Sequence, residues 1–223
     1  MQTELITYLS AFVTEARLKR FEEVLVNRTR HIAIGLENIY QAHNASAVLR
    51  SCDCFGIQDV HIIENQNKYS FNPDVSLGSE KWLTLNRYNN GEQSLETCIS
   101  NLKAKGYAIA VTSLHKDSYT IENVPITHKT ALFFGTEMRG ATAELESKAD
   151  MFVKIPMLGF TESFNISVAA ALSMYVLSSR LRKEEINWQL SEEDKEELRL
   201  QWLRNTIPKV ELLEKDFLQK NTE

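Results

Sequence analysis

The chain has 223 residues, of which 43% are hydrophobic and 25% are charged, which excludes a disordered or fibrous protein and predicts one compact domain with appendages. It lacks both a run of about 18 apolar residues and a secretory leader pattern, so we expect a cytoplasmic protein with no membrane partner. The formal net charge of −5 disfavours a nucleic-acid partner.

The amino-terminal region differs from the rest of the chain in charge. Residues 1–30 hold five basic and four acidic side chains and are the only net-positive block. A local basic patch can bind phosphates on an acidic protein, because salt screens distant charges within about 8–10 Å. The alternative is an ordinary solvated helix face. The basic residues are Arg17, Lys19, Arg20, Arg28 and Arg30.

Apolar periodicity predicts the elements of the first quarter of the chain. One long helix or two short helices are expected over residues 7–26, followed by a strand over 31–39. A helix over 44–56 comes next, with Asn44 as its expected N-cap and Gly56 as its carboxyl-terminal stop.

Strands and helices then alternate as far as residue 183. Strands are expected at 59–63, 82–85, 107–114, 130–135 and 151–156, and helices at 92–105, 142–149 and 165–183. This alternation of helices with near-continuous apolar strands predicts an α/β fold, with a mostly parallel sheet covered on both faces. The flanks, residues 1–30 and 184–223, contain only predicted helices, including one at 191–205, and we interpret them as extensions of an α/β domain.

Cysteine usage argues against a disulfide framework and against a metal site. The three cysteines, Cys52, Cys54 and Cys98, are an odd and sparse set that fits a reducing compartment. Tetrahedral zinc needs four ligands, and no second cysteine pair accompanies Cys52 and Cys54. We expect no metal.

The common nucleotide-binding and hydrolase motifs are missing from the sequence. No G-x-G-x-x-G, G-x-S-x-G or H-E-x-x-H pattern occurs. Gly135 and Gly140 have P-loop spacing, but Ala141 stands where the phosphate-binding lysine belongs. These observations argue against a P-loop ATPase and do not support a dinucleotide-binding loop.

Three longer segments combine polar residues with turn and helix signals. In the first, NASAVLRSCDCFGI, helical spacing places Arg50 roughly 150° from the centre of the apolar face, so its side chain points away from the core. The local alternative is an exposed Arg50 paired with Asp53. In the second, LFFGTEMRGAT, a strand runs into a turn that holds Glu137 between two glycines, and the alternative is a solvent-exposed Glu137.

The third segment, IPMLGFTESFNISVAAALSMY, places Ser163 and Asn165 before a helix of small residues. Asn165 alone could be no more than an N-cap. Three consecutive alanines let this helix approach another backbone closely, within the chain or in a dimer.

In this order, the three segments resemble the three signature motifs of the SPOUT-superfamily RNA ribose methyltransferases of the SpoU/TrmH type, over residues 31–180. The flanking segments TEARLKRFEEVL, WQLSEEDKEEL and QWLR resemble the helical extensions of the members that act on guanosine 18 of tRNA. The resemblance implies a deep trefoil knot in the carboxyl-terminal part of the sheet, a homodimer, and S-adenosylmethionine as cofactor. The implied organisation is a methyltransferase domain at 31–183 between helical extensions at 1–30 and 184–223.

The resemblance also implies roles for individual residues. The functional polar positions are Asn44, Arg50, Glu137, Ser163 and Asn165, and the cofactor contacts are Thr112, Gly135, Ile155, Leu158 and Phe164. The candidates for RNA contact are Arg17, Lys19, Arg20, Arg28, Arg30, His43, Arg180 and Arg182. The guanidinium of arginine holds its proton too tightly to act as a general base. We therefore expect Arg50, in its own subunit's site or its partner's, to orient a phosphate and stabilise developing negative charge.

The implied reaction is methyl transfer to a ribose 2′-hydroxyl of RNA, at the D-loop guanosine 18 of tRNA. Two alternatives stay open from the sequence. The same chemistry could act on ribosomal RNA or another tRNA position, or the chain could be a catalytically silent RNA-binding member.

Overall fold

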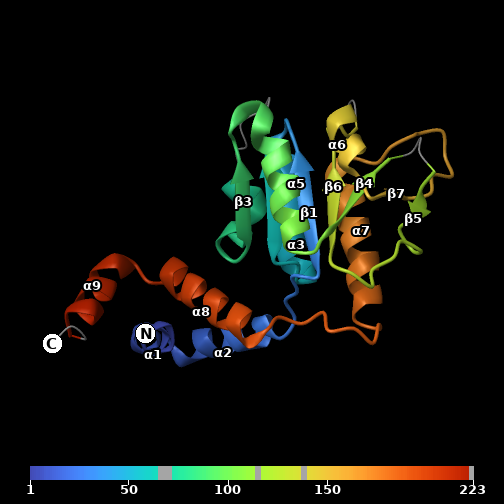
Figure 1. Cartoon of the computed structure of the whole chain (residues 1–223). Coiled ribbons are helices and arrows are strands. Elements are labelled where there is room, and N and C mark those ends of the chain that lie inside the picture. Colours follow the sequence, from blue (N-terminus) through green and yellow to red (C-terminus); the bar gives the residue numbers. More distant parts are fainter. Residues whose placement is uncertain (65–71, 114–116, 137–139, 221–223) are drawn as a thin grey trace. The chain divides into compact units, whose positions relative to one another are not determined.

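The structure, a computed structural model, describes residues 1–64, 72–113, 117–136 and 140–220 (Figure 1). The chain divides into two compact units. One unit is Thr29–Trp188, and the other combines Met1–Arg28 with Gln189–Glu223. Within the described ranges, no helix has the length and apolar character needed to cross a bilayer.

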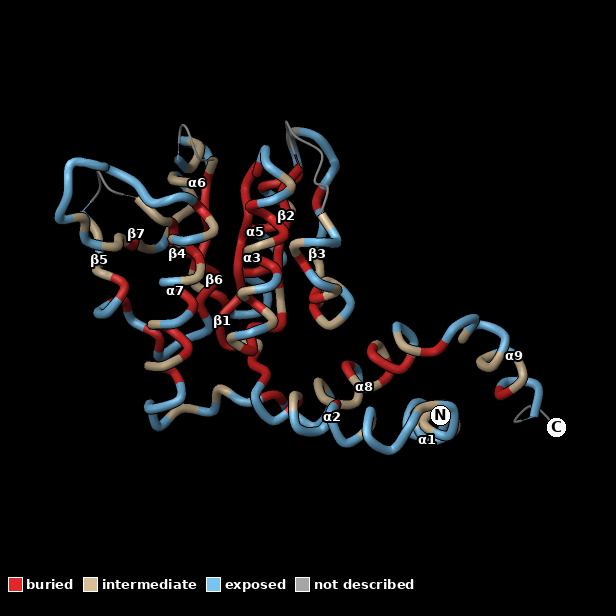
Figure 2. Tube along the Cα trace, turned by 180° about the vertical axis from the view of Figure 1, so that it is seen from behind, coloured by how far each residue is buried: buried red, intermediate tan, exposed pale blue. Residues whose placement is uncertain are grey.

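The Thr29–Trp188 unit is built on a seven-stranded sheet in the order β3-β2-β1-β6-β4-β7-β5, in which every pair of neighbours is parallel. Its strands are β1 (Ile32–Glu37), β2 (Asp59–Ile63), β3 (Thr84–Tyr88), β4 (Ala108–Thr112), β5 (Tyr119–Thr120), β6 (Thr130–Phe134) and β7 (Met151–Lys154). The central strands are buried (Figure 2). The α/β prediction with a mostly parallel sheet is therefore confirmed.

Helices cover both faces of this sheet. The helices are α3 (Ala42–Phe55), α4 (Pro73–Ser76), α5 (Ser94–Ala104), α6 (Ala143–Lys148) and α7 (Ile166–Leu181), with 3-10 turns at Ser79–Lys81 and Gly91–Gln93. One apolar cluster joins α3 and α7 to the sheet, and a second joins α5 and α6 to its other face. Strand β1 contributes to both clusters, because successive side chains of a strand point to opposite faces of the sheet. Ile32 and Ile34 belong to the first cluster and Ala33 to the second.

The first turn of α3 differs from the prediction. The helix begins at Ala42 with Gln41 as its N-cap, so the assignment of Asn44 as the N-cap is wrong. Gly56 does end the helix, in the left-handed conformation with a φ of 76°. Because Asn44 lies inside the helix, its side chain is available for a tertiary contact.

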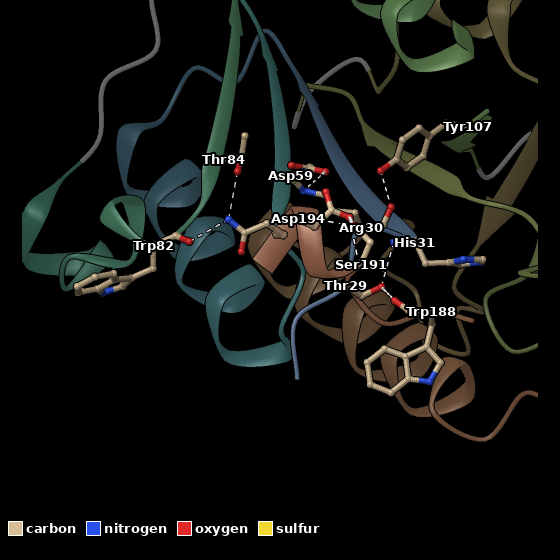
Figure 3. Close-up of polar contacts among 11 residues, drawn as sticks. Thr29, Arg30, His31, Asp59, Trp82, Thr84, Tyr107, Trp188, Ser191 and Asp194 are labelled. Atoms are coloured by element: carbon tan, nitrogen blue, oxygen red, sulfur yellow. Dashed lines mark hydrogen bonds and ion pairs between the residues drawn. The ribbon is translucent and has the colours of Figure 1, made fainter. Parts of the chain in front are cut away.

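The contacts at the entry and exit of the α/β unit join residues far apart in the sequence (Figure 3). Thr29 Oγ1 donates a hydrogen bond to the Trp188 carbonyl at 2.5 Å. The hydroxyl of Tyr107 donates to the carbonyl of Arg30, and the Arg30 guanidinium pairs with Asp59 at 3.6 Å. The chain therefore enters and leaves this unit at one point.

The other unit consists of helices from both ends of the chain: α1 (Gln2–Ser10), α2 (Glu15–Leu25), α8 (Glu192–Thr206) and α9 (Val210–Lys220). Thr14 caps α2 by accepting a hydrogen bond from the Arg17 N–H, which separates α1 from α2. Of the two predicted alternatives for residues 7–26, two short helices is correct. The rings of Phe21 and Trp202 pack edge to face, with centroids 5.4 Å apart.

Ser191 and Asp194 form a capping box at the start of α8, and both are labelled in Figure 3. This cap accounts for the predicted start of the helix at residue 191. Strand β5 and helix α4 were not predicted, because two and four residues are too few to show a period.

Candidate functional site

A pocket of about 360 Å³ lies at the carboxyl ends of β4, β6 and β7. The carboxyl edge of a parallel sheet is where α/β proteins usually bind ligands, and this volume lies in the range of small-molecule sites. The last residues of these strands and the residues after them supply the walls, together with Glu146 of α6 and the first half of α7. Its lining residues include Thr112, Ser113, Phe134, Gly135, Thr136, Gly140, Ala141, Glu146, Val153, Lys154, Ile155, Met157, Glu162, Ser163, Phe164, Ile166, Ala169 and Ser173.

Four of the five predicted cofactor contacts line this pocket: Thr112, Gly135, Ile155 and Phe164. Leu158 does not line it, and its side chain is fully exposed. It lies in the exposed segment that connects β7 to α7 (Figure 2). The pocket therefore brings together most of the predicted cofactor residues, whose roles stay predictions.

The turn after β6 makes one wall of the pocket and depends on a glycine. A Cβ atom on Gly135 would lie 2.2 Å from both the backbone nitrogen of Ala141 and the carbonyl carbon of Gly140. Thr136 and Gly140 exchange two backbone hydrogen bonds, each of 2.9 Å. The turn therefore folds back on its own start, and only a residue without a side chain fits at position 135.

Two predicted polar residues meet where α3 and α7 begin. The Asn165 side chain donates a hydrogen bond from Nδ2 to Oδ1 of Asn44 at 3.3 Å. Asn44 is buried, and its own Nδ2 donates to the Gln41 side chain at 3.1 Å. Asn165 also caps α7 by accepting from the Ser167 N–H at 2.9 Å. Asn165 is thus both the predicted N-cap and part of a tertiary pair.

Phe164 lies directly before Asn165 and lines the pocket, so this pair adjoins the pocket wall. Ser163 lines it as well. Glu137 lies outside the residues that the structure describes.

Arg50 lies on the exposed face of α3, as its helical position predicts. It does not line the pocket of its own chain. Within the described ranges its side chain makes no hydrogen bond or ion pair, so the alternative pairing with Asp53 does not occur. Arg50 is therefore a cation available to a group from outside the chain.

Sequence reasoning missed a buried hydroxyl in the pocket. Ser173 is 1% exposed and lines the pocket, and its Oγ has no hydrogen-bond partner in the described part of the chain. A buried polar atom without a partner is rare and requires an explanation. The available signal was a lone serine inside the apolar run AAALSMYVL.

The predicted RNA contacts divide into exposed and internally engaged residues. Exposed side chains are Arg17, Lys19 and Arg20 on α2, and His43 at the start of α3. Arg20 makes only a surface ion pair with Glu23, at 3.2 Å. These four residues are accessible to a phosphate.

The other candidates are used in folding contacts. Arg28 is 1% exposed, and its guanidinium lies 5.6 Å from the centre of the Trp202 ring, so its assignment to RNA contact is wrong. Arg180 donates to the carbonyls of Ile121 and Val124, at 3.1 and 2.8 Å.

Arg30 and Arg182 are also engaged. Arg30 is held by Asp59. Arg182 is exposed but donates to the Phe55 carbonyl at 3.2 Å and lies over the Trp188 ring. A count of charges in the sequence could not distinguish these arginines from the accessible Arg17 and Arg20.

Comparison with known proteins gives a family and a fold. A family model described as the SpoU rRNA Methylase family matches residues 31–175. A tRNA (guanosine(18)-2′-O)-methyltransferase from Borreliella burgdorferi is 46% identical over 209 residues, which is 94% of each chain.

Two solved structures show the same fold. The TrmH/SpoU tRNA modifying enzyme of Aquifex aeolicus matches with a TM-score of 0.78 and 29% identity, over 87% of this chain and 98% of that chain. The SpoU methyltransferase AviRb of Streptomyces viridochromogenes, in complex with the cofactor AdoMet, matches with a TM-score of 0.59 and 20% identity, over 73% of this chain and 62% of that chain.

Proposed function

Because the chain belongs to the SpoU methylase family, we propose that it methylates the ribose 2′-hydroxyl of guanosine 18 in tRNA, with S-adenosylmethionine as methyl donor. The observation that carries this proposal is the 46% identity over 94% of the chain. An alignment of this extent includes part of both helical flanks as well as the α/β unit. It therefore favours the substrate of that relative over ribosomal RNA.

The pocket has the chemistry that S-adenosylmethionine needs. Its apolar walls, among them Val153 and Ile155, suit a purine ring, and its backbone edges offer hydrogen bonds. The unpartnered Oγ of Ser173 offers one more hydrogen bond, and the carboxylates of Glu146 and Glu162 offer negative charge to a cationic ligand. When bound, S-adenosylmethionine supplies a methyl group activated by a sulfonium charge.

Polar residues near the pocket would prepare the ribose. A 2′-hydroxyl is a poor nucleophile until its proton is removed or strongly polarised. Arg50 acts by orienting a phosphate and stabilising negative charge on the 2′-oxygen, rather than as a base, and the hydroxyl proton leaves through that phosphate or a neighbouring group. Asn44, Ser163 and Asn165 position the substrate and the connecting segment, and we keep Glu137 as a residue that holds the turn.

We further propose that the active form is a homodimer, in which Arg50 completes the site of the partner subunit. Arg50 does not line the pocket of its own chain. An apolar stripe, Phe164, Val168, Leu172 and Tyr175, is exposed along α7 and its amino end. A stripe of this kind favours burial against a second copy. The stripe includes a residue of the pocket wall, so a dimer through it would bring the partner close to the pocket.

Membership of the family supports proposals for the remaining parts of the family pattern. We propose that residues 31–183 form the methyltransferase domain with a trefoil knot, and that the extensions 1–30 and 184–223 contact tRNA in the cytoplasm. The close passage of Gly135 against Gly140 and Ala141 supports a tightly wound chain in this region.

Methyl transfer from labelled S-adenosylmethionine to an unmodified tRNA transcript, with the product nucleotide mapped, tests the proposed reaction. We expect ribose methylation at guanosine 18. Methylation only of ribosomal RNA or of another tRNA position would keep the enzyme class and refute the substrate. Absence of both methyl transfer and cofactor binding would favour a silent RNA-binding protein.

Reversing the charges of the exposed basic residues on α2 tests the RNA contact. The triple variant Arg17→Glu, Lys19→Glu, Arg20→Glu should weaken tRNA binding by about 100-fold or more, because each lost phosphate contact removes counterion release. Cofactor affinity should not change, since these residues lie outside the pocket. Filter binding for tRNA and calorimetry for cofactor measure the two effects.

The matched control is Lys103→Glu, Lys105→Glu, Lys129→Glu. These three lysines are exposed on the α/β unit, away from the carboxyl edge of its sheet, and change the net charge equally. One of them makes a surface ion pair, Lys103 with Asp150, as Arg20 does with Glu23. Equal losses of tRNA affinity in the two triple variants would refute a specific patch on α2.

A further inference from the structure

Glu37, the last residue of β1, is a buried carboxylate that does not line the pocket. Only 1% of its surface is exposed. In the described part of the chain it forms no ion pair with a basic side chain. Burial raises the pKa of Glu37, against two hydrogen bonds from Thr142 that lower it. Burying a carboxylate costs free energy unless hydrogen bonds compensate it, so the two hydrogen bonds from Thr142 stabilise Glu37 in its buried place.

Both carboxylate oxygens of Glu37 bind the same residue. Oε2 accepts the backbone N–H of Thr142 at 2.9 Å, and Oε1 accepts the Thr142 hydroxyl at 2.6 Å. The Thr142 Oγ1 in turn accepts the N–H of Leu145 at 3.2 Å, which caps α6. Leu145 is fully buried in the core cluster. Glu37 therefore fixes the start of α6 from the side of β1.

This contact bears on the pocket wall. The residues directly before Thr142 are Gly140 and Ala141, and both line the pocket. The parallel register pairs Leu36 with Phe134, so Glu37 and Gly135 follow at the same edge of the sheet. Glu37 thus holds Thr142, at one end of the segment 140–142. The other end of this segment, Gly140 and Ala141, packs against Gly135.

We propose that Glu37 is a positioning residue, which holds Gly140 and Ala141 in the place that S-adenosylmethionine binding requires. It does not touch the ligand. The proposal rests on the proposed function, because it names the ligand of the same pocket.

The consequence is an effect on affinity rather than on turnover. Without the two acceptors, the start of α6 is displaced in a fraction of the molecules, and apparent affinity falls in proportion to the fraction that stays competent. If about one molecule in ten stays competent, the Kd for cofactor rises about tenfold. Turnover at saturating cofactor changes little, because the ligand selects the competent form.

The decisive comparison is Glu37→Met against Glu37→Gln in the full-length protein. Met keeps the length of the side chain and removes both acceptors, and we expect Kd and KM for S-adenosylmethionine to rise about tenfold, with kcat within about threefold of wild type. Gln can still accept the Thr142 N–H and donate to the hydroxyl, so it should stay within about threefold of wild type in all three constants.

A second pair of variants keeps the test valid if Glu37→Met does not fold. Thr142→Val removes the hydroxyl, whereas Thr142→Ser keeps it. We expect a several-fold rise in the cofactor Kd for Val and a value near wild type for Ser. Calorimetric titration with S-adenosylmethionine, with thermal unfolding of each variant, gives the result without an RNA substrate.

The outcomes separate the two proposals. If wild type binds S-adenosylmethionine and the Met and Val variants bind it equally well, the role of Glu37 is refuted and the proposed function stands. A lower kcat in these variants, with an unchanged KM for S-adenosylmethionine, would also refute the proposal that Glu37 positions the pocket wall. If the wild-type protein does not bind S-adenosylmethionine, both the proposed function and the role of Glu37 are refuted.

Discussion

Arg50→Ala should lower the rate of methyl transfer by a factor of about 10²–10³ while cofactor affinity stays unchanged, since removal of one preorganised charge-stabilising donor has this effect. Arg50 is exposed, its side chain makes no hydrogen bond or ion pair with the described residues, and it does not line the pocket. The variant should therefore fold as wild type does. Single-turnover methylation of unmodified tRNA, beside calorimetric titration of the cofactor, measures both quantities.

Arg50→Lys is the control that separates charge from geometry. A lysine keeps the positive charge but cannot offer two parallel N–H groups to a phosphate. We expect it to recover less than about a tenth of the wild-type rate. Recovery of most of the rate would show that bidentate guanidinium geometry is not needed, and would refute the assigned role.

Mixing two inactive variants tests whether Arg50 acts across the dimer. Co-expression of Arg50→Ala with a chain altered in the pocket should regain activity if each site combines one subunit's pocket with the other's arginine. Activity no greater than that of either variant alone would place Arg50 in its own chain's site, or argue against a dimer.

Gly135→Ala should lower the free energy of unfolding by about 2 kcal/mol or more and weaken cofactor binding at least about tenfold. The added Cβ would lie 2.2 Å from backbone atoms of Gly140 and Ala141, and backbone cannot move aside as a flexible side chain can. Relief of this overlap requires a shift of the turn that lines the pocket. Urea unfolding and cofactor titration measure the two losses.

Gly159→Ala provides the matched control. Gly159 lies in the segment between β7 and α7, and an added Cβ there meets nothing within 4 Å. Its stability and cofactor affinity should equal those of wild type. Equal behaviour of the two alanine variants would refute the argument that the backbone of the turn excludes a side chain at Gly135.

The order of elements in the α/β unit was predictable from the sequence, because long apolar strands and helices have distinct periods. The helix over 165–183 and the stop at Gly56 are examples. Strand β5 was not predictable, since its place at the sheet edge depends on pairing with β7 rather than on its own two residues.

The site could be predicted only in part, because several polar side chains make contacts with residues far away in the sequence. Asn44 has the residue type of an N-cap, yet the helix starts two residues earlier and its amide bonds with Asn165, 121 positions away. Arg28 and Arg180 have the charge of RNA contacts but complete folding contacts instead. Nothing in the local sequence of Glu37 indicates that it binds Thr142, because that contact exists only once β1 and β6 are neighbours.

The joining of both chain ends into one helical unit has a consequence for how such proteins can diversify. Phe21 from the amino-terminal flank packs on Trp202 from the carboxyl-terminal flank. At the boundary of the α/β unit, the Thr29 hydroxyl donates a hydrogen bond to the Trp188 carbonyl. The two flanks therefore form one helical unit in which each flank depends on the other. In the sequence, 163 residues lie between Arg28 and Glu192, where α8 begins. Exchange of both flanks together should leave the α/β unit intact, whereas exchange of one flank would remove the partner on which the apolar residues of the other flank pack.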